Sequence, residues 1–406
     1  MTDNNKTNNY RPSRNNRGEF GFNSRPKNDA YAPKPRNNNP NELVKIGISQ
    51  GDINGIGYEV MLKCFADSRM MDCCTPILYG SSKILSYYKK LIGANDFAFL
   101  NIRQANQAED HKFNVLNIIQ EEVKIDVGQP TEIGGKLAAM SLERACQEVM
   151  DGHIDALVTN PINKKNIQSD TFNFPGHTEY LTKKFGADES LMIMTCRNIH
   201  IGIMTNHLAL TDVPKILTKE LIIRKLRVMD NSLRRDFGIR MPKIAVLALN
   251  PHAGDHGLIG REDDEIVAPA IKEAFDQGIL AFGPYPSDGF FGNGSMNDFD
   301  GVMALYHDQG LIPFKLMSFT EGVNFTAGLP YVRTSPAHGT AYEIAGKNQA
   351  SAQSFRNAVY LAADIIRNRR EYDELTSDTL KKARRENMID EDITNELQKD
   401  DEEPTI

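Results

Sequence analysis

The chain has 406 residues, of which 40% are hydrophobic and 25% charged, with a formal net charge of −7. This length and composition can bury a sizeable core in one large domain or two medium ones. No apolar run approaches the roughly 20 residues of a membrane span, and the first residues form no signal region, so we expect a cytoplasmic protein that neither inserts into a membrane nor is exported.

The two ends of the chain differ in composition from its middle. Residues 1–42 hold twelve Asn and eight Lys or Arg against four Asp or Glu, with little to bury, so we expect a disordered leader. An RNA-contacting arm is the alternative there, although the nearly neutral middle predicts no nucleic-acid groove. Residues 371–406 hold thirteen acidic residues against five basic ones and predict a partly helical acidic tail. The folded region is expected over residues 43–370.

Between the ends, short β-branched or apolar runs alternate with longer amphipathic stretches. This alternation is typical of an α/β fold, and about nine strands are too many for one small domain, which favours two lobes that share a cleft. In chain order the predicted elements are a strand at 44–49, a helix from about 57, a strand at 76–80, helices at 81–94 and 134–152, strands at 156–160, 190–196 and 199–205, a helix at 220–237, a strand at 243–249, a helix at 263–278, strands at 302–307 and 322–328, and a helix at 351–369. The five cysteines lack CxxC spacing and are expected to be buried thiols.

Three histidines follow predicted strands directly, namely His207, His252 and His307. Ligands of open α/β sheets bind at the carboxyl ends of strands, and three imidazoles leave a coordination position open on a divalent metal ion. Each histidine alone is more often an ordinary hydrogen-bonded residue, but the three together predict a catalytic metal site. His256 is a rival ligand, although the glycines around it disfavour a helical pairing with His252.

A second group of residues has the chemistry of an anion site. Lys315, Asn324 and Arg333 follow one another at intervals of nine residues, in a stretch rich in turn residues and short strands, and these side chains suit a phosphate or carboxylate. Three solvated side chains are the alternative. His177 and Thr178 follow Pro-Gly at a possible helix start, where free N–H groups bind anions.

The segment GDINGIGYE, residues 51–59, is as rich in glycine as a phosphate loop but matches neither the Walker A spacing nor the dinucleotide fingerprint. We interpret Gly51, Gly55 and Gly57 first as backbone requirements after the strand and only second as sites of ligand approach.

Six motifs in consistent order resemble the family of 4-hydroxythreonine-4-phosphate dehydrogenases, NAD-dependent enzymes of pyridoxal phosphate biosynthesis. The resemblance runs from about Val44 to Arg367 and excludes both ends of the chain. The motifs are VTNPINK (158–164), PGHTEYL (175–181), LNPHAG (249–254), YHDQGLIPFK (306–315), VNFTAGLPYVRTS (323–335) and HGTAYEIAG (338–346).

The resemblance implies a fold, an assembly and a set of ligands. The fold would be that of isocitrate and isopropylmalate dehydrogenases, two α/β lobes with the active site in the cleft, in a homodimer whose subunits share that site. One divalent ion (Zn, Mg or Co) would be bound by His207 and His252 with His307 from across the dimer interface. The phosphorylated substrate would contact His177, Thr178, Lys315, Asn324 and Arg333. NAD or NADP would lie on the backbone of His338, Gly339, Thr340 and Ala341, and the catalytic residues would be Asp288 and Lys315.

The implied reaction oxidises 4-phosphohydroxy-L-threonine at its 3-hydroxyl and then decarboxylates it to 3-amino-2-oxopropyl phosphate. The chain departs from the family at Ala337, where many members have an acidic residue beside the cofactor loop. A dehydrogenase of the same fold for another acid, such as phosphorylated erythronate or threonate, therefore stays open. So do a non-catalytic metal- or phosphate-binding protein and a phosphate acyltransferase, although acyl transfer has no need of three metal-binding histidines.

Overall fold

The computed structural model describes residues 42–169 and 172–377. The expected leader lies outside these residues except for Glu42, and the expected acidic tail lies outside them beyond Ser377. Within the described part, no helix is long and apolar enough to cross a membrane. The five cysteines are free thiols; four are buried, as expected, whereas Cys73 is partly exposed.

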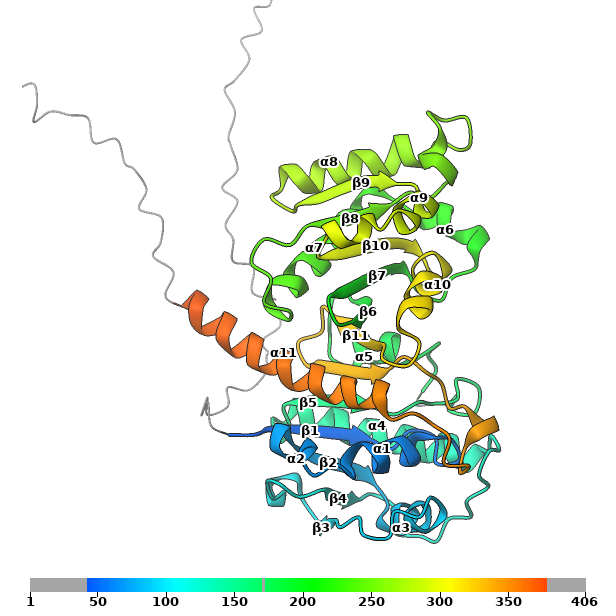
Figure 1. Ribbon diagram of the computed structural model, residues 1–406, viewed down its shortest axis with the longest axis vertical. Coiled ribbons are helices and arrows are strands. Elements are labelled where there is room, and N and C mark those ends of the chain that lie inside the picture. Colours follow the sequence, from blue (N-terminus) through cyan, green and yellow to red (C-terminus); the bar gives the residue numbers. More distant parts are fainter. Residues whose placement is uncertain (1–41, 170–171, 378–406) are drawn as a thin grey trace, which may run out of the picture. The chain divides into compact units, whose positions relative to one another are not determined.

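A twelve-stranded sheet runs through the described residues in the order β3-β4-β2-β1-β5-β12-β11-β6-β7-β10-β8-β9 (Figure 1). The strands that the apolar runs predict are all present. They are β1 (Val44–Ser49), β2 (Cys74–Gly80), β5 (Ala156–Thr159), β6 (Leu191–Cys196), β7 (Ile199–Thr205), β8 (Ile244–Leu247), β10 (Gly301–Tyr306) and β11 (Val323–Ala327).

The expected count of about nine strands was too low. The further strands are β3 (Leu100–Ile102), β4 (Asn114–Asn117), β9 (Ala281–Tyr285) and β12 (Val332–Pro336). These strands are short or carry polar residues, a glycine or a proline, and so they lack the uninterrupted apolar run that marks a buried strand.

Two parallel halves of the sheet are joined by an antiparallel centre. Strands β3, β4, β2, β1, β5 and β12 pair in parallel, as do β7, β10, β8 and β9. In the centre β11 pairs antiparallel with both β12 and β6, and β6 with β7. Because three antiparallel pairings lie between β12 and β7, the two parallel halves run in opposite directions. The mixed sheet with helices on both faces confirms the α/β fold.

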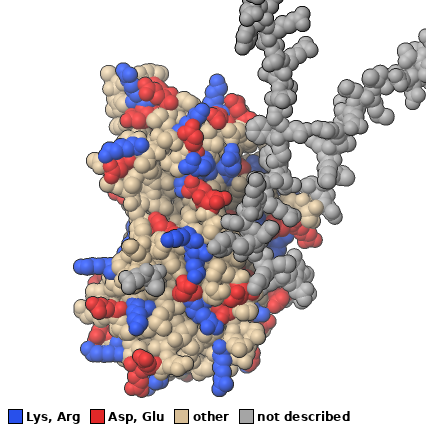
Figure 2. Space-filling view, turned by 180° about the vertical axis from the view of Figure 1, so that it is seen from behind, with Lys and Arg blue, Asp and Glu red and all other residues tan. Residues whose placement is uncertain are grey.

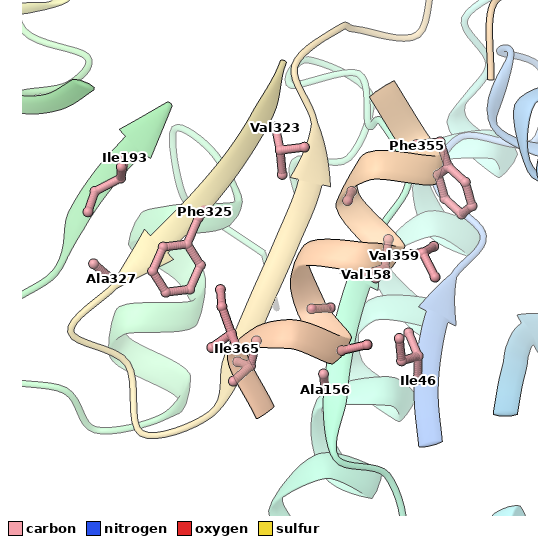
Figure 3. Packing of buried hydrophobic residues seen from close by; sticks show 14 of the residues in the cluster. Ile46, Ala156, Val158, Ile193, Val323, Phe325, Ala327, Phe355, Val359 and Ile365 are labelled. Carbon is pink, nitrogen blue, oxygen red and sulfur yellow. The ribbon is translucent and has the colours of Figure 1, made fainter. Parts of the chain in front are cut away.

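Helices cover both faces, and the alternation of side chains along β5 shows how the two cores arise. Ala156 and Val158 belong to one buried cluster and Leu157 to another, because successive strand residues point to opposite faces. On the first face α11 (Gln353–Ser377) lies across β1, β5, β12 and β11, where Phe355 and Val359 pack against Ile46 and Val158 (Figure 3). On the opposite face α4 (Glu132–Met150) contacts β1, β2 and β5.

The remaining helices follow the same pattern. Of these, α1, α3, α7 and α8 were predicted, α5 was expected only as a possible helix start, and α2, α6, α9 and α10 were not predicted. The expected helix at 263–278 begins as a π-helix over Asp263–Val267. The α-helices are α1 (Gly57–Phe65), α2 (Met70–Cys73), α3 (Ser82–Leu91), α5 (His177–Lys184), α6 (Val213–Ile216), α7 (Lys219–Arg235), α8 (Ala268–Asp276), α9 (Ser287–Gly292) and α10 (His307–Ser318).

The glycines of residues 51–59 serve the backbone, as expected. Gly51 has a φ of +68°, and a Cβ there would lie 2.5 Å from the carbonyl oxygen of Pro161. A Cβ on Gly55 would lie 2.9 Å from the carbonyl oxygen of Thr340. These residues are glycine because other segments approach the backbone too closely for a side chain.

Charged side chains of both signs are interspersed on the face that Figure 2 shows. A nucleic-acid groove instead gathers lysine and arginine into one stripe.

Candidate functional site

A cavity of about 260 Å³ lies where the two halves of the sheet meet. Its lining comes from the carboxyl ends of β5 and β12, from β6 and β11, from the starts of α5 and α10, and from the segment that follows β7. Of the residues predicted from the sequence, it gathers His177, Thr178, His207, His307, Lys315, Asn324, Arg333, His338 and Gly339. Two of the three histidines predicted to bind a metal and the residues predicted to bind an anion thus share one cavity.

Arg333 is the most deeply buried charge of this cavity, with 2% of its surface exposed. Its Nε and Nη2 donate hydrogen bonds to Thr159 Oγ1 at 3.1 and 2.7 Å, and its Nη1 donates to Thr326 Oγ1 at 3.1 Å. Burial lowers the pKa of Arg333 to about 10, which still leaves it protonated at neutral pH. No carboxylate pairs with it among the described residues, and a buried unpaired charge is costly, so an anionic ligand is the natural partner.

Lys315 and Asn324 extend the positive and polar wall beside Arg333. Asn324 lies on β11, next to β12, which carries Arg333, and its Oδ1 is buried without a hydrogen-bond partner. Lys315 lies on α10 with its side chain exposed at the cavity. The expectation that Lys315 lies among turns and short strands was wrong, because its segment forms a helix. The grouping of the three residues around one cavity agrees with an anion site.

The first turn of α5 forms another part of the wall. Gly176, His177 and Thr178 line the cavity, and His177 Nε2 is buried without a hydrogen-bond partner. Burial, together with the charges of Arg333 and Lys164, lowers the pKa of His177 well below its usual value. The ring is therefore neutral, and it offers a ligand one hydrogen-bond donor or acceptor.

His207 and His307 lie close together within one chain, with ring centroids 6.2 Å apart. Their Nδ1 atoms contact carboxylates, with His207 Nδ1 lying 3.0 Å from Glu179 Oε1 and His307 Nδ1 2.7 Å from Asp308 Oδ1. Burial on its own would raise the pKa of Glu179, but the hydrogen bond from His207, a backbone hydrogen bond and the charges of His207 and Lys164 together lower it. A carboxylate on Nδ1 is the usual support of a metal-binding histidine, because it directs Nε2 toward the metal.

The described residues of one chain do not form a complete metal site. No group of three or more His, Cys, Asp or Glu side chains is placed to hold a metal ion within residues 42–169 and 172–377. His207 Nε2 lies 3.0 Å from Lys164 Nζ, which a metal ion would have to displace. The structure brings His207 and His307 together in the same chain, whereas His307 was expected from across the dimer interface.

His252 and Asp288 do not line the cavity. His252 is exposed in a loop where residues 252–257 all have positive φ, so the helical pairing with His256 is absent, as expected. Buried Asp263 fixes the start of this loop by accepting hydrogen bonds from the backbone N–H groups of Leu249 and Asn250 at 2.7 and 2.9 Å. Asp288 is exposed in the short helix α9.

The predicted cofactor residues begin at the cavity wall. His338 and Gly339 line the cavity, and His338 Nε2 is buried without a partner. A Cβ on Gly339 would meet nothing within 4 Å, so open space lies beside this backbone, as a cofactor there requires. Thr340 and Ala341 lie next to the cavity in sequence but do not line it.

Several cavity residues were missed by reasoning from the residues alone. Thr159 and Asn160 end β5, and both side-chain polar atoms of Asn160 are buried without a partner. The rule that singled out the histidines, a polar residue directly after a buried strand, could have found them. Lys164 and Glu179 act through His207, and no local pattern links them to it.

Comparison with known proteins places these features in a family. Residues 72–362 match the family model described as pyridoxal phosphate biosynthetic protein PdxA. The chain is 48% identical over 351 residues to the 4-hydroxythreonine-4-phosphate dehydrogenase of Bacteroides thetaiotaomicron, covering 86% of this chain and 96% of that protein. It is 40% identical to the enzyme of that name from Sulfurihydrogenibium sp., covering 81% and 100%. The crystal structure of the enzyme of that name from Klebsiella pneumoniae superposes with a TM-score of 0.69 at 31% identity, covering 80% of this chain and 100% of that one.

Proposed function

The chain belongs to the PdxA family of pyridoxal phosphate biosynthetic proteins, and we propose that it oxidises 4-phosphohydroxy-L-threonine with NAD and a divalent metal ion. Oxidation at the 3-hydroxyl gives a β-keto acid, and loss of carbon dioxide then gives 3-amino-2-oxopropyl phosphate. The observation that carries this proposal is the buried, unpaired guanidinium of Arg333 in the same cavity as His207 and His307. Such a cavity suits a substrate with a phosphate at one end and a metal-coordinating hydroxyl at the other.

The phosphate end is formed by residues that donate hydrogen bonds. Arg333 and Lys315 supply positive charge, the Asn324 amide and neutral His177 supply further polar contacts, and Thr178 lies in the first turn of α5, where backbone N–H groups are free. Holding the phosphate there fixes a small, flexible substrate at one end, and this restriction contributes to rate by orientation.

The other end of the cavity suits the reacting hydroxyl. His207 and His307 would hold the metal ion through Nε2, with Glu179 and Asp308 fixing the two rings. When bound, the metal supplies Lewis acidity to the hydroxyl and the nicotinamide accepts the hydride. Of the two residues expected to be catalytic, Lys315 lines the cavity and Asp288 does not.

A homodimer would complete the site. Near the cavity, α10 exposes Ile312 at 58% and Leu316 at 84%, and Phe319 directly after the helix at 77%. Apolar side chains this exposed and this close together favour a protein interface. We propose that α10 packs on a second copy of the chain, whose His252 supplies the third metal ligand, so the residue assigned to the partner becomes His252 rather than His307.

The test is turnover across a panel of phosphorylated hydroxy acids with NAD and with NADP, monitored by NADH or NADPH absorbance. 4-Phosphohydroxy-L-threonine should have the highest kcat/KM, and phosphorylated erythronate or threonate should be poor substrates. A higher kcat/KM for one of those acids would change the proposed substrate but leave the proposed oxidation chemistry in place. No oxidation of any member, with metal present, would refute the dehydrogenase assignment.

A further inference from the structure

The loop of residues 338–350, called here the cofactor loop, is anchored on residues 51–59, called here the glycine segment. Ile56 N donates a hydrogen bond to the Thr340 carbonyl oxygen at 3.0 Å. Tyr342 donates its hydroxyl hydrogen to Asp52 Oδ2 at 2.7 Å, and Asp52 is 1% exposed. The half of the loop nearest the cavity is therefore tied to the segment that follows β1.

Glu59 anchors the other half of the cofactor loop. Its carboxylate is fully buried at the start of α1, and it accepts hydrogen bonds from two loop backbone groups, Gly346 N at 3.2 Å and Ala350 N at 3.0 Å. Lys63 Nζ lies 2.9 Å from the same carboxylate and also donates to the Ala350 carbonyl oxygen at 2.8 Å. A buried carboxylate is stable only with such partners, and two of the three belong to the loop.

Close backbone packing holds the loop from two sides. A Cβ on Gly55 would lie 2.9 Å from the Thr340 carbonyl oxygen, and a Cβ on Gly128 would lie 2.9 Å from the Tyr342 carbonyl oxygen. Neither position has room for a side chain. Residues of the glycine segment thus contact the cofactor loop at several points along its length. Neither Asp52 nor Glu59 lines the cavity itself.

We propose that Glu59 is a positioning residue for the nicotinamide cofactor, acting through the backbone of residues 346 and 350 rather than by contact with the cofactor. The proposal rests on the proposed function, because it takes the cofactor to bind at residues 338–341. A loop that is already ordered loses little conformational freedom when the cofactor binds, whereas a loosened loop must be ordered at that moment. Glu59 therefore sets cofactor affinity without affecting the phosphate end of the cavity.

The experiment compares Glu59→Gln with Glu148→Gln in the full-length protein. Glutamine has one acceptor oxygen in place of two, so Glu59→Gln cannot satisfy both loop N–H groups and Lys63. Glu148 is a matched control, since it is also buried and contacts Arg144 and His153 on and after α4, away from the loop. Dissociation constants for NAD and NADP are measured by calorimetry, KM is measured for each substrate, and hydrogen exchange is followed in residues 338–350.

Glu59→Gln should raise the dissociation constant and KM of the cofactor roughly tenfold, as expected for one lost hydrogen bond to a charged group. Hydrogen exchange in residues 338–350 should rise, while KM for the phosphorylated substrate and the Glu148→Gln values should stay near wild type. Faster loop exchange with unchanged cofactor affinity would overturn the proposal, and so would an equal loss in Glu148→Gln.

A second variant keeps the test decisive if Glu59→Gln fails to fold. Tyr342→Phe removes only the hydroxyl that donates to Asp52 and keeps the ring. It should raise the cofactor dissociation constant several-fold with faster loop exchange, and an unchanged constant would overturn the anchoring proposal. A wild-type protein that binds neither NAD nor NADP would instead refute the proposed function.

Discussion

Replacing Arg333 by lysine tests the anion site, because it keeps the charge and removes the planar fork. Three of the five guanidinium N–H groups already bond to Thr159 and Thr326, which leaves two for a ligand. A lysine ammonium has three N–H groups and no fixed fork, so it cannot bond to both threonines and also hold a phosphate in two-pronged geometry.

The expected loss follows from those two N–H groups. A hydrogen bond to a charged group contributes about 1.5 to 3 kcal/mol, so losing one at this buried position should lower kcat/KM for the phosphorylated substrate roughly ten- to a hundredfold. Cofactor affinity should be unchanged. The unphosphorylated substrate, 4-hydroxythreonine, should be poor with the wild type and lose little further with the variant, because it has no phosphate for Arg333 to hold.

Steady-state kinetics with both substrates measure this difference, and Arg369→Lys is the control. Arg369 is also buried, with an ion pair to Asp236 at 2.6 Å and hydrogen bonds to the carbonyl oxygens of Leu329 and Pro330, but it does not line the cavity. Arg369→Lys should lower the free energy of unfolding in urea and leave kcat/KM near wild type. Equal losses of both substrates with Arg333→Lys would mean that Arg333 is structural.

Three further outcomes are expected. His207→Ala, or removal of metal by a chelator, should abolish turnover. The free energy of unfolding should change little in the variant, because the His207 side chain is 30% exposed. Full activity of a metal-free sample would contradict the metal site. Burial lowers the pKa of His200 to about 4, so as the pH falls the unfolded state binds the proton before the folded state does. The free energy of unfolding should therefore fall by about 1.4 kcal/mol per pH unit from pH 6.5 toward pH 4. His200→Gln should flatten this slope in urea unfolding, and an unaltered slope would mean that another group causes it. Leu316→Glu should convert a dimer to a monomer in analytical ultracentrifugation and abolish turnover. The control, Leu375→Glu on the exposed end of α11, should do neither. A Leu316→Glu protein that remains a dimer would exclude α10 as the interface.

The sequence predicted the parts of the fold that depend on local patterns. Runs such as Val44–Ser49 and Leu191–Cys196 are largely apolar because both faces of these strands are buried, and such runs can be found without knowing the neighbours. Strand β12 could not be found in this way. Its polar residues are stabilised by distant partners, as Arg333 is by Thr159, which is 174 residues away in sequence.

The candidate site was predicted better than the elements that hold it. The positions after strand ends identified His207 and His307, and residue chemistry identified Lys315, Asn324 and Arg333 before any of them could be shown to share a cavity. Glu179 and Lys164 both contact His207, and these contacts exist only once distant segments of the chain have come together. These cavity residues therefore leave a sequence signal, whereas Glu179 and Lys164, which contact one of them, do not.

His252 lies outside the cavity that His207 and His307 line within one chain. His252 follows β8, as His207 follows β7 and His307 follows β10, but it lies five residues beyond the strand end, and only the other two histidines line the cavity. Its loop is nevertheless fixed, because buried Asp263 holds the backbone of Leu249 and Asn250 and residues 252–257 keep positive φ. A backbone held in this costly conformation, with an exposed imidazole, is suited to meet a ligand outside its own chain. In the proposed dimer the exposed apolar side chains of α10 contact the second chain, so we expect metal binding and dimerisation to depend on each other.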